Sequence, residues 1–484
     1  MHCPVVSQSV VGVTNGVMAV GKASSAQPSE VGRVSLSGPA VPGSVRPGFN
    51  RSWGVQVVSD MWQTFPVVTN VSVSAAVEPR IFSDCVVVTL DDDLRLNISV
   101  SHSCADGVTF TVLASATAPS GCVLPLSLGP VFVASKLQYP VRPAPWARVV
   151  PLRGIAGRRA LSVHEEQDST SVIASSTWDP GVLMAAYISE AVLAARAADP
   201  AATAAGGLRA ILRGLSVGSS FCALSDAPLR CVEVGSGCGI AGLALAAACP
   251  HSRVLLTDGD PRACALASKN VANNGLSGRV EARRLTWRSD CSADVAEACA
   301  VIGGPPHIVL AADVVYREET FVPLVDTLVA LCDADRASRA EVLFAYRPRV
   351  DDEHFFHLLE EAFEMTQIVA PGVTKRLLHA ATCEGNGSAP VDGESAPAAA
   401  PAAEPTGTGH ALAKCAAAAP ECTFAHDTAL EHDGCFDASP AACMIFRLRR
   451  REVFSPLACR ICAQRRAAAA AAAAAISTAR AVRG

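Results

Sequence analysis

The chain has 484 residues and a formal net charge of −5 at pH 7, and only 5% of its residues are aromatic although 50% are hydrophobic. No basic block is long enough to form a nucleic-acid footprint, so we expect no nucleic-acid partner. No apolar run approaches the roughly 20 residues of a membrane-spanning helix, which predicts a soluble protein without a membrane partner. The 19 cysteines are scattered, which indicates free thiols in a reducing compartment.

The N-terminal third carries weak signals. Residues 1–80 are low in charge, contain many Gly, Pro and Ser residues, and show no sustained period, so a disordered segment is expected there. Residues 81–160 contain the strand-like runs "CVVVTL", "LRLNISVSH" and "VTFTVLAS", which predict a small β-rich extension.

The region 161–378 alternates between strand and helix patterns. Asp179 and Pro180 are a helix-start signal, and helical spacing follows in "GVLMAAYISEAVLAA". Strands are predicted at 229–235, 253–258, 279–286, 307–315 and 341–347, and helices at 240–249, 261–273, 319–332 and 351–363. This alternation predicts an α/β fold with a doubly wound sheet and a cofactor beyond the carboxyl ends of its strands.

The C-terminal part returns to low complexity. Residues 379–441 are rich in Ala, Pro, Gly and Ser and predict an insertion that does not fold alone. The run "CMIFRLRR" predicts the last strand of the sheet within residues 442–450, and an Ala-rich tail follows at 451–484.

The stretch "CVEVGSGCGIAG" at 231–242 has two interpretations. Gly237, Gly239 and Gly242 have the G-x-G-x-x-G spacing of a dinucleotide-binding turn. Glu233 with alternating glycines from Gly235 instead has the pattern of S-adenosylmethionine sites. The glycines alone do not decide between the two cofactors.

Asp258 ends the second strand about twenty residues further on, where a carboxylate would accept both ribose hydroxyls of either cofactor. Three further features favour the methyl donor when they are taken together. Glu233 stands inside the first strand, where it would bind the methionine amino group, and Trp287 follows the third strand, where it would cover the adenine. Asp313 and Tyr316 end the fourth strand and face the reaction centre.

Taken in order, these motifs resemble the seven-β-strand, non-histone protein lysine methyltransferases, the methyltransferase family 16 type. The resemblance is carried by "TWDPGVLMAAYISE", "VEVGSGCGIAGL", "LLTDGDP", "LTW", "VLAADVVYREETFVPLVDTLVALC" and "EVLFAYRPR". It covers about half the chain, residues 161–378 and 443–450, and is nearest to the branch that methylates the seventy-kilodalton heat-shock chaperone. It implies a Rossmann-like, seven-stranded class I methyltransferase sheet with helices on both faces.

The resemblance also implies site residues. Asp313 and Tyr316 match the family's D-x-x-Y signature at the substrate lysine, and Arg347 matches a recurrent position without an assigned role. The S-adenosylmethionine pocket would be lined by Trp178, Gly235, Ser236, Gly237, Asp258, Trp287 and Ala312. The N-terminal extension, the stretch 198–228 and the insertion depart from the family pattern and leave the substrate open.

The sequence therefore predicts an S-adenosylmethionine-dependent protein lysine N-methyltransferase, a cytoplasmic and nuclear monomer acting on a chaperone or a translation factor. Two alternatives stay open: an inactive binding module that keeps the fold, and a dinucleotide-dependent oxidoreductase. No metal is expected, because the Cys and His residues at 422, 426, 432 and 435 lack the spacing of a standard zinc finger.

Overall fold

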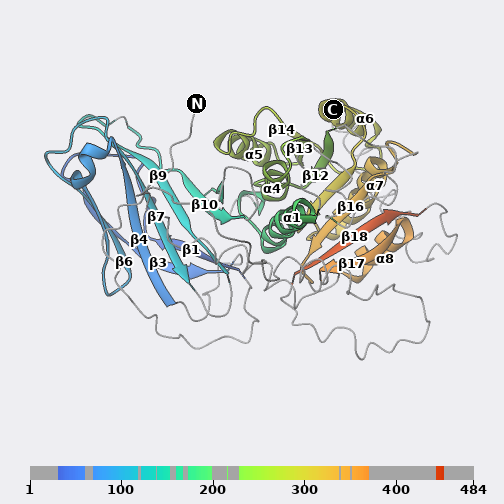
Figure 1. Cartoon of the computed structure of the whole chain (residues 1–484), viewed down its shortest axis with the longest axis horizontal. Helices are drawn as coiled ribbons and strands as arrows, with labels where there is room; N and C mark the ends of the chain where they lie inside the picture. Colours follow the sequence, from blue (N-terminus) through green and yellow to red (C-terminus); the bar gives the residue numbers. More distant parts are fainter. Residues whose placement is uncertain are drawn as a thin grey trace, which may run out of the picture.

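The computed structural model describes residues 31–59, 69–117, 122–137, 139–152, 160–166, 173–198, 215, 228–336, 339–348, 352–369 and 443–451. In this part of the chain a β-sandwich precedes an α/β unit, and Figure 1 shows the sandwich on the left of the α/β unit. Among the described helices, none combines the length and the apolarity that crossing a membrane requires.

The sandwich consists of two mainly antiparallel sheets. One has the strand order β5-β6-β3-β1-β8, and the other has the order β11-β10-β9-β7-β4 with β2 paired to β9. Buried side chains alternate with exposed or half-buried ones along β5, β6 and β7, because one face of each sheet packs on the shared core. The strands are β1 (Val31–Ser37), β2 (Ser44–Val45), β3 (Asn50–Val58), β4 (Thr69–Glu78), β5 (Val86–Leu90), β6 (Arg95–Val100), β7 (Thr109–Thr117), β8 (Cys122–Leu124), β9 (Leu126–Val133), β10 (Trp146–Pro151) and β11 (Ala160–His164), with a 3-10 turn η1 (Arg80–Cys85).

The expected disorder of residues 1–80 is wrong for the described part of that range, where β1 to β4 form. Residues 1–30 and 60–68 lie outside the described residues. The pairing of these strands is non-local, since β1 lies between β3 and the distant β8, so no local repeat reveals it. The β-rich extension expected at 81–160 is therefore one part of a sandwich that starts at Val31.

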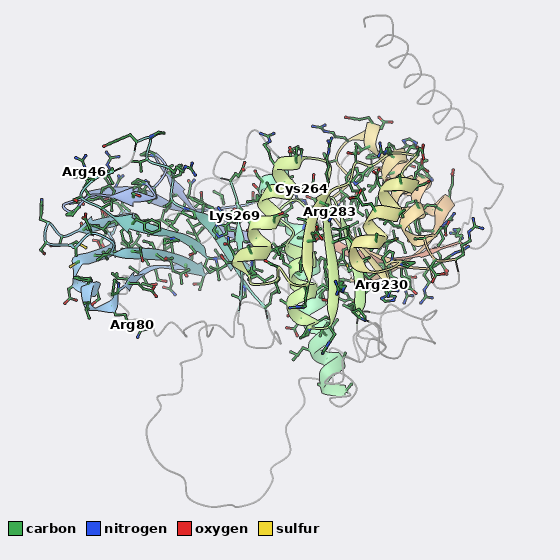
Figure 2. All side chains as sticks on the ribbon, turned by 90° about the horizontal axis from the view of Figure 1, so that it is seen from above. Arg46, Arg80, Arg230, Cys264, Lys269 and Arg283 are labelled. Carbon is green, nitrogen blue, oxygen red and sulfur yellow. The ribbon has the colours of Figure 1, made fainter. Side chains whose placement is uncertain are left out.

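Strand β11 joins the sandwich to the α/β unit. One of its edges pairs with β10, and its other edge is covered by the helix α5 (Pro261–Asn273). Asn270 accepts from the His164 N–H at 2.7 Å and donates to the His164 carbonyl at 3.1 Å. Asn274 accepts from the Ser162 N–H at 3.0 Å and donates to its carbonyl at 2.7 Å. Two amide side chains one helical turn apart thus take the place of a neighbouring strand. Figure 2 shows α5, which carries Cys264 and Lys269, on the side of the α/β unit that faces the sandwich.

Replacing Asn274 with alanine is expected to lower the free energy of unfolding by about 1–3 kcal/mol, because the Ser162 N–H and carbonyl lose their partner. Urea denaturation of the full chain measures this. Asn273→Ala is the matched control, since the neighbouring Asn273 is exposed and should change stability by no more than about 0.5 kcal/mol. Equal losses in both variants would contradict the role given to Asn274.

The α/β unit contains a seven-stranded sheet of order β14-β13-β12-β15-β16-β18-β17. All neighbouring pairs are parallel except those of β18, which lies antiparallel between β16 and β17. The predicted Rossmann-like seven-stranded sheet is confirmed, and "CMIFRLRR" supplies β18. The strands are β12 (Leu229–Val234), β13 (Ser252–Asp258), β14 (Val280–Arg284), β15 (Ile308–Ala312), β16 (Glu341–Tyr346), β17 (Phe363–Val369) and β18 (Met444–Arg450).

Helices cover both faces of this sheet (Figure 1). Along β12, Cys231 packs in one core with α1, α4 and α5, while Val232 and Val234 pack in another with α6, α7 and α8. The strand is buried on both faces, which explains its continuous apolar sequence. The helices are α1 (Asp179–Ala198), α4 (Ile240–Ala248), α5, α6 (Ser292–Ile302), α7 (Phe321–Cys332) and α8 (Glu353–Ala362), with 3-10 turns η2 (Ile173–Ser175) and η3 (Glu318–Thr320).

Two elements of this unit are not predicted from the sequence. Helix α6 consists mostly of Ala, Val, Cys and acidic residues and has no clear helical period. Strand β17 is an edge strand whose partner β18 follows only after the predicted insertion. The insertion at 379–441 and the tail beyond Arg451 lie outside the described residues.

Candidate active site

A cavity of about 540 Å³ lies at the carboxyl ends of β12, β13 and β15, where a doubly wound sheet binds its ligands. Its volume is that of an ordinary small-molecule site. Every residue predicted for the site lines this one cavity: Trp178, Glu233, Gly235, Ser236, Gly237, Asp258, Trp287, Ala312, Asp313 and Tyr316. Except for Trp178, which precedes α1, these residues come together because they lie at the ends of parallel strands that meet at one edge of the sheet.

The glycine turn has a backbone that only glycine adopts readily. Gly235, Gly237 and Gly239 have φ values of 64°, 51° and 82°. At Gly235 a Cβ would stand 2.8 Å from both Trp287 and Val314, so a side chain there would also collide with the cavity wall. The turn thus places the backbone of residues 235–237 directly against the cavity.

Gly242, the last glycine of the dinucleotide pattern, has a packing role. A Cβ there would lie 2.4 Å from Leu256 and 2.7 Å from the Glu233 carboxyl group. Its N–H donates to Glu233 Oε2 at 2.8 Å, so the first turn of α4 fixes this carboxyl group. The G-x-G-x-x-G spacing is therefore explained by helix packing and does not require a pyrophosphate.

Two carboxyl groups face the cavity with raised pKa values. Glu233 is 2% exposed, and burial raises its pKa to about 8. Asp258 accepts from the Gly237 N–H at 3.0 Å and from the Asp260 N–H at 2.9 Å, yet burial still raises its pKa above the ordinary value. A cationic ligand in this cavity would favour the ionised forms of both groups.

Binding of S-adenosylhomocysteine is expected to strengthen as the pH rises from 6 to 7.5. In the free protein Glu233 holds its proton below its pKa of about 8, and a ligand ammonium group favours the carboxylate, so binding releases a proton. One released proton limits the gain in affinity to about tenfold per pH unit.

Isothermal titration across this pH range, in buffers of different ionisation enthalpy, measures both the affinity and the proton. The isosteric variant Glu233→Gln should lose most of the pH dependence and the released proton. Any part of the pH dependence that comes from Asp258 should remain. An unchanged slope in this variant would show that Glu233 does not bind the amino group.

Two polar groups in the cavity lack partners within the described residues. The Ser236 hydroxyl and the Trp287 indole N–H are buried without a hydrogen bond. Such groups are rare in folded proteins unless a ligand or water satisfies them. Trp178, which also lines the cavity, donates its indole N–H to the Ile173 carbonyl at 3.0 Å, which orients its ring. Together with the close-packed glycine turn and the two carboxyl groups, these residues fit an adenosine linked to a cationic amino acid.

Asp313 and Tyr316 occupy the remaining side of the cavity. Asp313 follows β15 with a φ of 57°, which non-glycine residues rarely adopt, and its N–H donates to the Ala345 carbonyl at 3.0 Å. This left-handed residue turns the chain at the strand end and places Asp313 on the cavity. Tyr316 is 44% exposed, and the guanidinium of Arg317 lies 5.8 Å from the centre of its ring. Tyr316 therefore forms the rim that an incoming substrate would meet.

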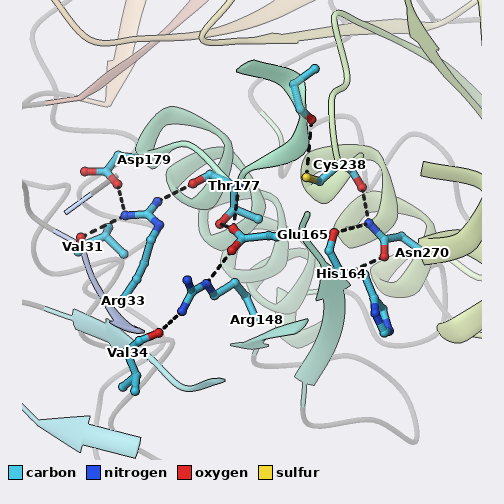
Figure 3. Close-up of polar contacts among 11 residues, drawn as sticks. Val31, Arg33, Val34, Arg148, His164, Glu165, Thr177, Asp179, Cys238 and Asn270 are labelled. Atoms are coloured by element: carbon cyan, nitrogen blue, oxygen red, sulfur yellow. Dashed lines mark hydrogen bonds and ion pairs between the residues drawn. The ribbon is translucent and has the colours of Figure 1, made fainter. Parts of the chain in front are cut away.

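Arg347 does not line the cavity and instead contacts Asp179, the first residue of α1. Its guanidinium is 3.8 Å from Asp179 Oδ2, and Arg33 of the sandwich is 2.8 Å from Asp179 Oδ1. The sequence identified Asp179 only as a helix start and did not identify Arg33 at all. Figure 3 shows Arg33 between Asp179 and Thr177. No sequence motif marks Arg33, because its role depends on the pairing of the whole sandwich.

Two features define a class I methyltransferase domain. The seven-stranded sheet has one antiparallel strand, β18, between β16 and the edge strand β17, and a cavity lies at the carboxyl edge of the sheet. Residues 157–362 match the model of the family described as lysine methyltransferase, so this part of the chain is similar to that family. The cofactor is accordingly S-adenosylmethionine, and the dinucleotide alternative is not favoured.

Curated relatives agree with this assignment. The chain is 32% identical over 146 residues to protein-lysine N-methyltransferase EFM6 of Saccharomyces cerevisiae, covering 29% of this chain and 58% of that protein. It is 32% identical over 143 residues to protein N-lysine methyltransferase METTL21A of Danio rerio, covering 29% and 59%. The matches thus span less than two thirds of these relatives. A solved dimethyltransferase, RosA of Streptomyces davawensis, is 24% identical over 25% of this chain and 33% of its own, with a TM-score of 0.20.

Proposed function

We propose that this protein transfers a methyl group from S-adenosylmethionine to the side-chain amine of a lysine in a non-histone protein. The observation that carries the proposal is the convergence of Glu233, Asp258 and Trp287 with Asp313 and Tyr316 on one cavity. The first three suit the cofactor, and the last two lie where the substrate would enter.

The cofactor supplies a sulfonium methyl group that is already activated for displacement. The protein has to align the lysine amine with that group and exclude water. In this chain Glu233 and Asp258 would bind the amino group and the ribose, and Trp287 and Trp178 would enclose the adenosine. The Ser236 hydroxyl and the Trp287 N–H would gain the partners that they lack.

The lysine must react as a neutral amine. Its ordinary pKa is near ~10.4, so deprotonation at pH ~7 costs about 4–5 kcal/mol unless the site lowers the pKa. Desolvation in the cavity and a neighbouring positive charge both act in that direction. Asp313 would orient the amine and accept its proton through water, while Tyr316 would form the wall of the lysine channel.

The test is incubation of the purified full chain with methyl-labelled S-adenosylmethionine and a cell lysate, followed by mass spectrometry of the labelled proteins. We expect methylated lysines on a small number of proteins, and strongly reduced labelling of the same lysines with Asp313→Asn. Isothermal titration with S-adenosylhomocysteine and, in parallel, with a reduced nicotinamide dinucleotide should show binding of the first ligand only. Cofactor binding without any labelled lysine would overturn the proposal in favour of an inactive binding module.

We further propose that the substrate is a chaperone or a translation factor, and that the protein acts as a monomer in the cytoplasm and the nucleus. The curated names of the relatives support a protein substrate. Eleven cysteines of the described part are free thiols, which supports a reducing compartment. Gel filtration of the full chain, together with the identity of the labelled proteins, tests these assignments.

A further inference from the structure

One wall of the cofactor cavity is held by the β-sandwich. This wall is the segment 173–181, whose cavity-lining residues include Ile173, Thr177 and Trp178. Thr177 donates its N–H and its hydroxyl to Glu165 Oε1 at 2.8 Å and 2.6 Å. Its carbonyl accepts from Arg33 Nη2 at 2.7 Å. The polar groups of Thr177 are thus bonded to residues that lie outside the seven-stranded sheet and its helices.

Arg33 of β1 contacts the two residues of this wall that flank Trp178. Besides the Thr177 carbonyl, it contacts Asp179 Oδ1 at 2.8 Å, and its Nη1 also donates to the Val31 carbonyl at 3.1 Å. The Arg33 and Asp179 side chains are only 4% and 1% exposed, so water cannot replace these bonds. A planar guanidinium with several donors suits this geometry, whereas a lysine ammonium would not span both partners equally well.

Arg148 of β10 supports the same wall through Glu165. Its Nε donates to Glu165 Oε2 at 2.7 Å, and its Nη1 donates to the Val34 carbonyl. Glu165 in turn accepts hydrogen bonds from Thr177. Two arginines of the sandwich thus support Thr177, Arg33 directly and Arg148 through Glu165 (Figure 3). Buried charges of this kind are tolerated only when they are paired and hydrogen-bonded, as they are here.

The glycine turn has a related connection to the sandwich. Asn270 covers the edge of β11 and also donates to the Cys238 carbonyl in the glycine turn at 3.0 Å. The Cys238 thiol lies 3.6 Å from the Ala174 carbonyl, so the glycine turn and segment 173–181 also meet. Apolar residues join the two units as well: Val31, Leu124, Val150 and Leu161 share one core with α1 and α4. The sandwich and the cavity are therefore one packed structure.

We propose that the β-sandwich forms an integral part of the cofactor site and that Arg33 is its positioning residue, holding Thr177 and Asp179 so that the Trp178 wall is preformed. The identity of the ligand rests on the proposed function, but the positioning role does not. Arg33 does not line the cavity and touches no reacting atom. Its loss should therefore lower the fraction of molecules with a formed wall, which weakens cofactor affinity by the same factor and leaves the methyl-transfer step itself intact.

The test compares Arg33→Met with Arg450→Met in the full chain. Arg450 is a matched control, because its side chain is also buried, 7% exposed, and paired with Asp333 at 3.2 Å. In the register of β18 against β16, Leu448 lies opposite Val342, which places Arg450 at the edge of the sheet away from the cavity. Both variants should lose stability, but only Arg33→Met should affect the cavity.

Two measurements are made on each variant. Hydrogen exchange of the ligand-free protein should accelerate about tenfold or more for residues 177–183 in Arg33→Met and stay unchanged there in Arg450→Met. The dissociation constant of S-adenosylhomocysteine should rise about tenfold in Arg33→Met. The KM for the cofactor should rise equally, with kcat at saturation unchanged, and Arg33→Lys should recover part of the affinity.

The outcomes separate the two proposals. Unchanged exchange at 177–183 in Arg33→Met, or faster exchange with an unchanged dissociation constant, overturns the positioning role of Arg33. Equal weakening of cofactor binding in Arg450→Met also overturns it, because a general loss of stability would then suffice. If the unaltered protein fails to bind S-adenosylhomocysteine, the proposed function fails, and the exchange data still decide whether Arg33 holds the wall.

Discussion

Replacing Asp313 with asparagine is expected to reduce kcat for lysine methylation by about 10²-fold or more, since the variant loses the carboxylate that orients the amine and accepts its proton. Asparagine is nearly isosteric and tolerates the left-handed φ of 57° at this position, so the strand end should keep its shape. Single-turnover methylation of the identified substrate measures the loss.

Cofactor affinity should change by less than about threefold in this variant, which isothermal titration measures. Asp313→Ala is expected to abolish transfer as well, but alanine is strained in this conformation by about 1–2 kcal/mol, so asparagine is the cleaner substitution. Glu319→Gln, at an exposed residue that does not line the cavity, serves as a control and should keep most of the activity. If transfer and cofactor affinity were lost together, Asp313 would be a cofactor ligand instead.

Replacing Arg148 with methionine is expected to lower the free energy of unfolding by about 3–5 kcal/mol, because the Glu165 carboxylate would stay buried without its cation. The two side chains are 1% and 5% exposed and 2.7 Å apart. Urea denaturation followed by circular dichroism measures the change, and a constant m-value would show that stability alone has altered.

Arg283→Met is the matched surface control, since Arg283 is 43% exposed in its pair with Glu281 and a solvent-exposed pair contributes little to stability. The double variant Arg148→Met with Glu165→Gln should recover part of the loss, because the unpaired charge is then removed. A loss for Arg148→Met no greater than that for Arg283→Met would contradict the structural role of this pair.

The same pair links stability to acidic pH. Burial alone would raise the pKa of Glu165, but Arg148 and the two hydrogen bonds from Thr177 bring this pKa below its ordinary value. A carboxylate with a lowered pKa in the folded state stabilises the protein at neutral pH, and that contribution is lost as the pH falls through the lowered value. Arg148→Met should therefore show a weaker acid dependence of its unfolding than the unaltered chain.

The residues that the sequence predicts for the site line one cavity, and each of them belongs to a short local pattern. Glu233, Asp258 and Asp313 each lie in or at the end of a buried strand. The carboxyl ends of parallel strands meet at one edge of the sheet, and this alone brings the three side chains together. Predicting this arrangement requires no knowledge of which distant strands pair with each other.

The supporting residues could not be predicted in this way. Arg33 is 144 positions from its hydrogen-bond partner Thr177, and it reaches that partner only because β1 pairs with β3 and β8. The sandwich itself depends on such distant pairings, so the sequence alone predicts disorder where its first strands form. Local periodicity identifies which residues form a strand more readily than it identifies which strands lie together.

The common core of Val31, Leu124, Val150 and Leu161 with α1 and α4 limits how the chain can be shortened. A fragment limited to residues 157–362 would lack Val31, Leu124 and Val150 and expose the apolar surface that they cover. Contiguous apolar surface of this kind promotes aggregation. The boundaries of the family match therefore do not coincide with a unit that would remain soluble by itself.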